Sequence, residues 1–239
     1  MRRADASAEA RPTENQLLAA LPSAVYQRLR PHLEPCILTV DQKLFPRVGP
    51  LKFGFFPVDS IVTLSYAIGD RAMAKAWPVG REGLAGISLL SDGAHRDNQA
   101  DVQFGGLAYR IPAGVLRREF RRGGAAQHLL LRYVFASITQ ASQLSVCNLY
   151  HSADKRLCRF LSRGFARVGG KELFITHARI ARLLGLRREA ITEIAMELHE
   201  AGIIRYCRGH ITLMNGKSLD ARACACNAII RRAFEEVTM

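Results

Sequence analysis

The spacing of apolar residues changes along the chain and divides it into three parts. In residues 37–112, short apolar runs alternate with Gly, Pro and Asp, which is typical of strands joined by tight turns. Residues 60–67 and 72–79 predict a hairpin, and residues 102–111 predict another strand with a pair of glycines inside it. Several short strands at this spacing favour a small antiparallel barrel or sandwich.

The second part, residues 115–150, has a helical pattern. It contains no proline, its glycines are Gly123 and Gly124, and apolar residues recur at three- and four-residue steps. A narrow apolar stripe on a long helix favours packing against a partner helix, so we predict a dimerisation helix here. The alternative is that the stripe packs on the chain's own strands. The expected interface residues are Leu130, Val134, Ile138, Ala141 and Leu144.

The third part predicts a winged helix-turn-helix. One helix is expected over residues 152–168, where an N-capping serine opens it and a glycine pair follows it. Residues 173–213 then predict a short helix capped by Thr176, a sharp turn at Gly185 and a second helix over residues 187–201. The two strands of the wing are expected at residues 203–206 and 210–213.

The second helix of this motif is suited to reading DNA. Such a helix fits the major groove, and the side chains of its first turns reach base edges. Arg188 can donate two hydrogen bonds to guanine, Glu189 can accept from the cytosine amino group, and Glu193 completes the predicted base-contacting set. The alternative is a helical pair whose charged face is merely solvated. Phosphate contacts, which position a protein without reading sequence, are expected from Thr176, Arg187, Thr192, Arg208 and His210.

The composition agrees with an anionic partner. The 239 residues include 34 Lys and Arg against 21 Asp and Glu, which gives a formal net charge of +13. The sequence has no apolar stretch of the roughly 18 residues that a transmembrane helix needs, and no signal-peptide pattern opens it. The six cysteines are too dispersed for a disulfide framework, so we expect a reducing, cytoplasmic location and no membrane partner.

The third part resembles the CRP/FNR family of bacterial transcription regulators. The resemblance rests on the segment ITHARIARLLGLRREAITEIAMELHEAGIIRYCRGHITL, with its turn glycine, the Arg188-Glu189 pair that opens the second helix, and Gly-Ile-Ile before the wing. It extends over almost the whole chain and implies an α+β fold. That fold has an N-terminal antiparallel β-roll, like a cyclic-nucleotide-binding domain, at residues 15–114, a long dimerisation helix at 115–150 and a C-terminal winged helix-turn-helix at 151–239.

The resemblance also implies a function. Members of this family act as homodimers on palindromic promoter DNA and work with RNA polymerase, and Arg188 and Glu189 stand where members contact bases. Many relatives have an arginine at the position of Glu193, so the base sequence that those relatives read is not assumed for this chain. We therefore expect a homodimeric, sequence-specific transcription regulator.

The β-roll of this family often binds cyclic AMP, but the matching residues here differ. Gly86 matches the family's glycine, whereas Ile87 replaces the acid that holds the ribose. Arg96 is the candidate phosphate ligand, and Asp97 beside it opposes anion binding. We therefore expect no binding of cyclic AMP, and the effector is unknown. Glu82 is expected to be a solvated turn charge, but Glu82, Gly86 and Arg96 are retained as the candidate effector pocket.

Other chemistry finds little support in the sequence. It contains no nucleophile elbow, no P-loop and no zinc-protease motif, so we expect no catalytic residues and no enzyme activity. Cys224 and Cys226 are expected about 200° apart around one helix, without a second ligand pair, so no metal and no cofactor are predicted. A cyclic-nucleotide-binding module, or a haem sensor with His95 or His128 as ligand, remain the alternative functions.

Overall fold

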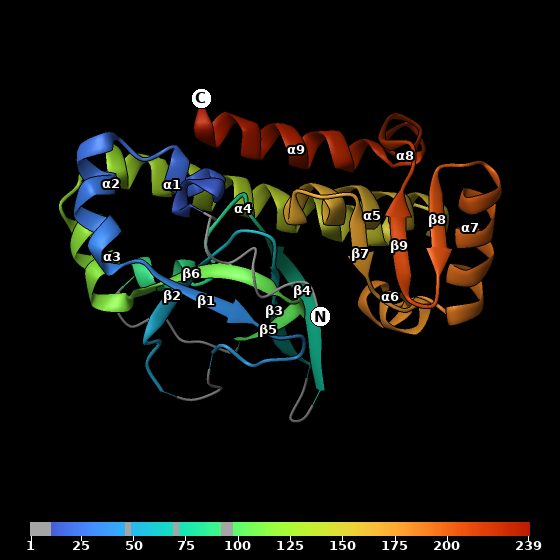
Figure 1. Ribbon diagram of the computed structural model, residues 1–239, viewed down its shortest axis with the longest axis horizontal. Coiled ribbons are helices and arrows are strands. Elements are labelled where there is room, and N and C mark those ends of the chain that lie inside the picture. Colours follow the sequence, from blue (N-terminus) through green and yellow to red (C-terminus); the bar gives the residue numbers. More distant parts are fainter. Residues whose placement is uncertain (1–10, 46–48, 69–71, 92–97) are drawn as a thin grey trace. The chain divides into compact units, whose positions relative to one another are not determined.

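The computed structural model describes residues 11–45, 49–68, 72–91 and 98–239 (Figure 1). The chain divides into two compact units, one formed by Met1–Ser137 with Phe234–Met239 and the other by Ile138–Ala233. The boundary between the units falls inside the long helix α4 (Gly124–Tyr150) and not at its ends. Among the helices of the described residues, none is long and apolar enough to cross a membrane.

The first unit is built on antiparallel strands. Within the described residues, one sheet has the strand order β1-β6-β2 and another has the order β4-β3-β5. The predicted hairpin is confirmed, because β3 and β4 pair from Val62 opposite Val79 to Ile68 opposite Ala72. The strands are β1 (Glu34–Leu38), β2 (Phe53–Pro57), β3 (Ile61–Ile68), β4 (Ala72–Val79), β5 (Asn98–Phe104) and β6 (Gly106–Pro112).

The prediction of a single strand over residues 102–111 is wrong. β5 ends at Phe104 in one sheet, and β6 begins at Gly106 in the other. A Cβ atom at Gly106 would lie 2.3 Å from the carboxylate of Asp59, which accepts a 2.5 Å hydrogen bond from the N–H of Leu107. The chain therefore changes sheets at a glycine that lets a carboxylate approach the backbone.

The prediction of one continuous helix over residues 115–150 is wrong. Gly123 and Gly124 have φ angles of 74° and 68°, a left-handed conformation that glycine adopts readily and that interrupts helical hydrogen bonding. As a result, α3 and α4 are separate helices. Besides α4, the helices here are η2 (Pro12–Glu14), α1 (Gln16–Ala19), α2 (Ser23–Leu29), η3 (Arg30–His32), η4 (Ile87–Leu90) and α3 (Ala113–Arg121).

Tyr133 of α4 anchors the core of the first unit. Its side chain is almost fully buried, and its hydroxyl donates a 3.1 Å hydrogen bond to the carbonyl of Leu84. The ring lies so close to the backbone of Gly83 that a Cβ atom there would be 2.3 Å from it. The ring of Phe234, in α9 (Ala225–Thr238), lies beside it with centroids 6.1 Å apart. These contacts tie the loop before η4 to α4.

Helix α4 carries apolar residues on more than one face, and this changes the expected dimer stripe. Leu130 is buried, and Val134, Ala141 and Leu144 are partly buried, so only Ile138 of the predicted set is well exposed among the described residues, at 51%. The large apolar side chains that α4 exposes are Leu131, Phe135, Ile138, Val146, Leu149 and Tyr150. The exposed set shares Ile138 with the predicted stripe, while Leu131 and Phe135 each follow a predicted residue by one position. Of the predicted stripe, only Leu130 is therefore buried within the single chain, and the role of these residues in a dimer stays a prediction.

The second unit has the predicted winged helix-turn-helix. Within the described residues its strands form a sheet in the order β7-β9-β8, in which β9 pairs with both neighbours (Figure 1). Strand β7 was not predicted, and its Leu173 pairs with Ile211 of the wing. The elements are α5 (Ala153–Val168), β7 (Glu172–Phe174), α6 (His177–Leu184), α7 (Arg188–Glu200), β8 (Ile204–Cys207), β9 (His210–Leu213) and α8 (Gly216–Arg222), followed by the start of α9.

Candidate nucleic-acid interface

The turn between α6 and α7 is fixed by several backbone contacts. The hydroxyl of Thr176 caps α6 by accepting from the N–H of Arg179 at 3.3 Å, as the sequence predicted. Gly185 ends the helix with a left-handed φ of 62°, and the N–H of Leu186 bonds the carbonyl of Ala181 at 2.9 Å. The guanidinium of Arg156, on α5, donates to the carbonyl of Leu184. The contact from Arg156 was not predicted, because it joins helices that are apart in sequence.

Helix α7 has the buried and exposed faces that its sequence predicts. Ile191, Ile194, Ala195 and Leu198 are buried against the rest of the second unit. The predicted base-contacting residues Arg188, Glu189 and Glu193 are exposed, and so is Arg187, which directly precedes the helix. The first turns of α7 therefore present one continuous charged surface. Its mixed charge suits contacts with base edges better than contacts with phosphates alone.

A buried histidine that the sequence analysis did not identify joins three elements. His177, at the start of α6, is 8% exposed and stacks on Tyr206 of β8 with ring centroids 3.9 Å apart. Its Nδ1 lies 3.1 Å from Oγ1 of Thr192 on α7. The Thr192 hydroxyl also donates to the carbonyl of Arg188 at 3.0 Å. Thr192, predicted to contact phosphate, is therefore engaged inside the protein, where it helps to position α7.

The surroundings of this histidine favour its neutral state. The Thr192 hydroxyl donates to the Arg188 carbonyl, so Nδ1 of His177 is the donor in its contact with Thr192 Oγ1. Among the described residues, the buried Nε2 atom has no hydrogen-bond partner. Burial lowers the pKa of the His177 imidazole, and the Arg188 cation lowers it further. Protonation of Nε2 would bury a charge with nothing to stabilise it.

This arrangement predicts a loss of stability in mild acid. The pKa of His177 is lowered in the folded state, so below about pH 6.5 the unfolded state binds more protons than the folded state and stability falls as the pH falls. Urea unfolding of the wild type at several pH values, followed by circular dichroism, should show this slope, and His177→Gln should reduce it. His199→Gln, at an exposed position of α7, should leave the slope in place. An unchanged slope in His177→Gln would show that His177 is not its source.

The wing turn brings two of the predicted phosphate contacts together. Arg208 and Gly209 have φ angles of 46° and 81°, as in the tight type I′ turn of a two-residue hairpin. The carbonyl of Gly209 accepts from the N–H of Ile175 at 2.8 Å, and a Cβ atom at Gly209 would lie 3.4 Å from the Thr176 side chain. Thr176 and Arg208 are both exposed, so the start of α6 and the wing tip form one polar edge.

His210 is less suited to the phosphate contact that the sequence predicts. Its ring stacks on Phe174 with centroids 4.5 Å apart, and its Nε2 lies 3.5 Å from the carboxylate of Glu172. A phosphate approaching this nitrogen would meet the carboxylate first. His210, the first residue of β9, therefore fits better as a residue that packs against β7.

The candidate effector residues are only partly placed. Arg96, Asp97 and His95 lie outside the described residues. Glu82 is 7% exposed, so the expectation of a solvated turn charge is wrong, because the loop that carries it packs into the first unit. Gly86 has a φ of 116° and precedes η4, where its Cβ position faces Phe45 and Leu89. His128, the other haem candidate, is exposed on α4.

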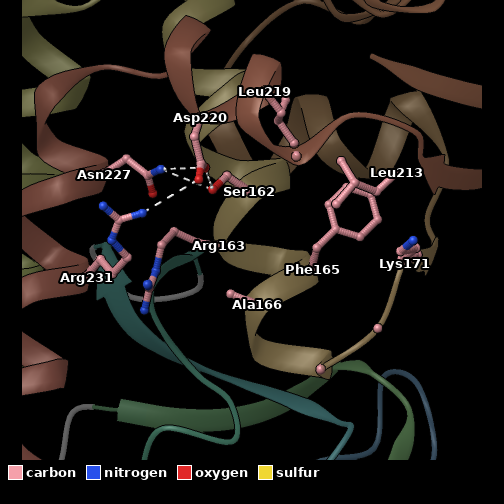
Figure 2. A pocket seen from close by; sticks show the side chains of 13 residues that line it. Ser162, Arg163, Phe165, Ala166, Lys171, Leu213, Leu219, Asp220, Asn227 and Arg231 are labelled. Carbon is pink, nitrogen blue, oxygen red and sulfur yellow. Dashed lines mark hydrogen bonds and ion pairs between the residues drawn. The ribbon is translucent and has the colours of Figure 1, made fainter. Parts of the chain in front are cut away.

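A cavity of about 400 Å³ lies in the second unit, outside the predicted interface. Its described lining comes from α5, the link between α5 and β7, the last residue of β9, α8 and α9, and none of these lining residues belongs to α6 or α7. Figure 2 shows Asp220 at one side, where it accepts from Ser162 and Asn227 and pairs with Arg231 at 3.6 Å. The polar side chains therefore bond one another and brace α5 against α8 and α9.

The expected geometry of the C-terminal cysteines is wrong. Cys224 lies in the link between α8 and α9, before the helix begins, so it is not on the opposite face of a helix from Cys226. Cys147 and His151, from the end of α4, lie beside them. The sequence did not reveal this second pair of side chains, because it lies more than seventy residues earlier in the chain.

Comparison with known proteins agrees with this geometry. Residues 155–222 match the Crp-like helix-turn-helix domain family. FixK2 from Bradyrhizobium japonicum has a similar structure, with a TM-score of 0.66 and 16% identity over 81% of this chain and 98% of that chain. A CRP-family transcriptional regulator from Thermus thermophilus, TTHB099, gives a TM-score of 0.59 and 15% identity over 79% of this chain and 96% of that chain. No curated protein matches the sequence.

A third structure carries the family name itself. A protein of Eubacterium rectale, described as a transcriptional regulator of the Crp/Fnr family, gives a TM-score of 0.60 and 17% identity over 87% of this chain and 98% of that chain. At such identities the solved structures establish the fold, and the domain match establishes the helix-turn-helix. The resemblance seen in the sequence is confirmed: the chain has the fold of the CRP/FNR family of transcription regulators and carries a Crp-like helix-turn-helix domain at residues 155–222.

Proposed function

We propose that the protein is a transcription regulator that binds palindromic promoter DNA as a homodimer and inserts α7 into the major groove. The observation that carries this proposal is the exposed first part of α7, with Arg188, Glu189 and Glu193, beside the polar edge of the wing. A helix with one buried apolar face and a charged outer face at this place in a Crp-like domain is suited to reading base edges. The net charge of +13 favours association with a polyanion.

The residues of this surface divide into two roles. Arg188 pairs with guanine through two hydrogen bonds, and Glu189 and Glu193 accept from cytosine amino groups. Arg187, Arg208 and Thr176 contact phosphates on either side and set the position of the helix. Thr192 and His210, which the structure engages in internal contacts, act by holding the reading helix and the wing in place.

The homodimer rests on the exposed apolar residues of α4. Phe135 is 68% exposed, Ile138 51% and Leu149 77%, which is costly for a helix that has no partner. Pairing of two copies along α4 would cover these side chains and present two reading helices. The operator half-sites would then be one helical turn apart, about 34 Å from centre to centre. Contact with RNA polymerase is part of the proposal on the strength of the family resemblance.

The effector part of the proposal is negative. Ile87, at the place of the family's ribose-binding acid, begins η4 and has no group that could bind a ribose hydroxyl. We therefore propose that the protein neither binds cyclic AMP nor needs it for DNA binding. Calorimetric titration of the full-length protein with cyclic AMP tests the binding directly, because a micromolar dissociation constant, about −8 kcal/mol, would contradict the proposal.

Two arginine substitutions separate base reading from phosphate binding. Arg188→Ala should weaken binding to the preferred site by about 1–3 kcal/mol and relax the preference at one base pair of each half-site. Arg208→Ala should weaken all sequences about equally and make binding less dependent on salt, because a phosphate contact releases counterions and reads no base. The measurement is binding to a library of half-site variants, first selected from random DNA with the wild-type protein.

Arg232→Ala is the matched control for these variants. Arg232 is an exposed arginine of α9, so its replacement removes the same charge without touching α7 or the wing. It should preserve the base preference and cost little affinity. If Arg188→Ala kept the wild-type preference at every position, α7 would not be the reading helix. If the selection enriched no sequence at all, the proposal of a sequence-specific regulator would fail.

A further inference from the structure

Four side chains with metal-binding atoms meet where α4 ends and α9 begins. Cys147 and His151 are four residues apart at the end of α4, where the N–H of His151 still bonds the carbonyl of Cys147 at 3.2 Å, so both point to one side. Cys224 lies between α8 and α9, and Cys226 lies in the first turn of α9. The sulfur and nitrogen atoms of all four side chains lie within 4.8 Å of one another. All four residues belong to the second unit.

Two of the distances between these atoms are close to the edges of a tetrahedral zinc site, and all of them are within 4.8 Å. Zinc holds thiolate sulfur at about 2.3 Å and imidazole nitrogen at about 2.0–2.1 Å, so two sulfurs around it are about 3.8 Å apart and a sulfur and a nitrogen about 3.6 Å apart. Here the Sγ atoms of Cys147 and Cys224 are 3.5 Å apart, and Sγ of Cys226 is 3.6 Å from Nδ1 of His151. A disulfide would bring two sulfurs to about 2.05 Å.

We propose that Cys147, His151, Cys224 and Cys226 bind one Zn²⁺ ion with tetrahedral geometry. Three thiolates and one imidazole are a donor set that zinc prefers. The three cysteines are buried, so the protein supplies every ligand and leaves no open position for a substrate. Such closed sites stabilise structure and do not carry out catalysis. A multi-iron cluster fits less well, because its ligands bond different iron atoms and lie further apart than atoms that share one ion.

A neighbouring arginine suits the charge of this site. Three thiolates around a divalent ion leave one excess negative charge. Arg159, on α5, is 6% exposed, and its Nε donates a 3.2 Å hydrogen bond to Sγ of Cys147. A buried guanidinium needs an anionic partner, and a zinc-bound thiolate is a better one than a thiol. The charges of the four ligands, the ion and Arg159 then sum to zero.

The ion would connect segments that the sequence separates. It would join the last turn of α4 to the start of α9 and fix the link after α8, inside the second unit. Metal binding would therefore add to the stability of this unit, and the gain would rise with the logarithm of the free zinc concentration above the dissociation constant. This inference is independent of the proposed DNA sequence preference, since none of the four ligands belongs to α6, α7 or the wing of the described structure.

The first test is the metal content of the full-length protein. The protein is purified without an affinity tag or a chelator and is kept in a phosphine reductant. Elemental mass spectrometry should then find about one zinc ion per chain. Replacement with Co²⁺ should give the strong visible bands of tetrahedral cobalt and a thiolate-to-metal charge-transfer band in the near ultraviolet. Zinc binding should also raise the melting temperature, and a chelator should reverse the rise.

Single substitutions locate the site. Cys224→Ser and His151→Ala should each bind much less zinc than the wild type. In the cobalt-substituted protein, each variant should also lose or shift the charge-transfer band. Cys158→Ala is the matched control, because Cys158 is a fully buried cysteine of α5 outside the four-residue group, and it should keep both signals. Cys36→Ser, in β1 of the first unit, should keep them too. If a ligand variant does not fold, titration of the wild type with Co²⁺ still gives the stoichiometry and the number of thiolates.

Three results would overturn the proposal. One is a wild-type protein that holds less than about one zinc per ten chains after equilibration with Zn²⁺ under reductant. Another is an equal loss of metal in Cys158→Ala and in the ligand variants. The third is a Cys147–Cys224 disulfide in protein freshly purified before any reductant is added, which would make the group a redox pair.

Discussion

Replacing Phe135 and Ile138 of α4 with lysine is expected to separate the protein into monomers and to abolish tight operator binding. Both side chains are more than half exposed in the single chain and lie about one turn apart on α4. Two copies paired along this helix would bury four lysine side chains without partners, which costs several kcal/mol per interface. Light scattering of wild type and variant at the same concentration measures the change.

The effect on DNA is larger than the loss of two contacts suggests. A dimer binds its second half-site as an intramolecular event, so a monomer should bind the whole operator about 10²–10⁴-fold more weakly. Ile37→Lys is the control, because Ile37 is an equally exposed apolar residue on β1. It should leave the dimer and the affinity unchanged. A double-lysine protein that remained dimeric and kept its affinity would place the interface elsewhere.

Alanine at Gly83 is expected to destabilise the first unit by about 3 kcal/mol, the upper part of the range for overpacked cores. The new Cβ atom would lie 2.3 Å from the ring of Tyr133. The ring cannot move aside easily, since it is 1% exposed, its hydroxyl bonds the carbonyl of Leu84, and Phe234 packs beside it. Urea unfolding followed by fluorescence of Trp77, the single tryptophan, reports on this unit.

Two further variants identify the clash as the cause. In a Tyr133→Leu background the ring is absent, so Gly83→Ala should cost less than about 1 kcal/mol, and the two changes should not be additive. Gly114→Ala, in α3, is the control, because the nearest atom to its Cβ position is the Arg118 side chain at 3.7 Å. It should be neutral or slightly stabilising. Equal costs for Gly83→Ala in both backgrounds would show that Tyr133 is not the obstacle.

The parts of the fold that depend on local pattern were predictable from the sequence. Ile191, Ile194, Ala195 and Leu198 follow the period of a helix with one buried face, and all are buried in α7. The hairpin of β3 and β4 and the turn at Gly185 likewise follow from residues near one another in sequence. The base-contacting role of the exposed residues stays a prediction.

What could not be predicted depends on which distant segments meet. α4 is apolar on several faces, so periodicity alone did not distinguish the buried Leu130 from the exposed Phe135 five residues later. The sequence around His177 gives no sign that this side chain contacts Tyr206 and Thr192, because both lie on other elements. The cysteines near residue 225 gave no sign of Cys147, because nothing in a linear sequence shows that the end of α4 reaches them. Glu82 was expected to be exposed because charged residues in turns are usually exposed to solvent, but its side chain is buried.

The buried imidazole at the start of α6 also bears on how an operator is chosen. His177 contacts α7 and β8 from the start of α6, so in the proposed DNA complex α7 and the wing would keep a fixed spacing. If the protein surface is rigid, the DNA must change shape to fit it. Base steps differ in stiffness: TA and CA steps kink easily, whereas A-tracts resist bending. Base pairs that no side chain reaches then contribute to affinity through the energy needed to deform them. The preferred operator should therefore extend beyond the base pairs that α7 itself contacts.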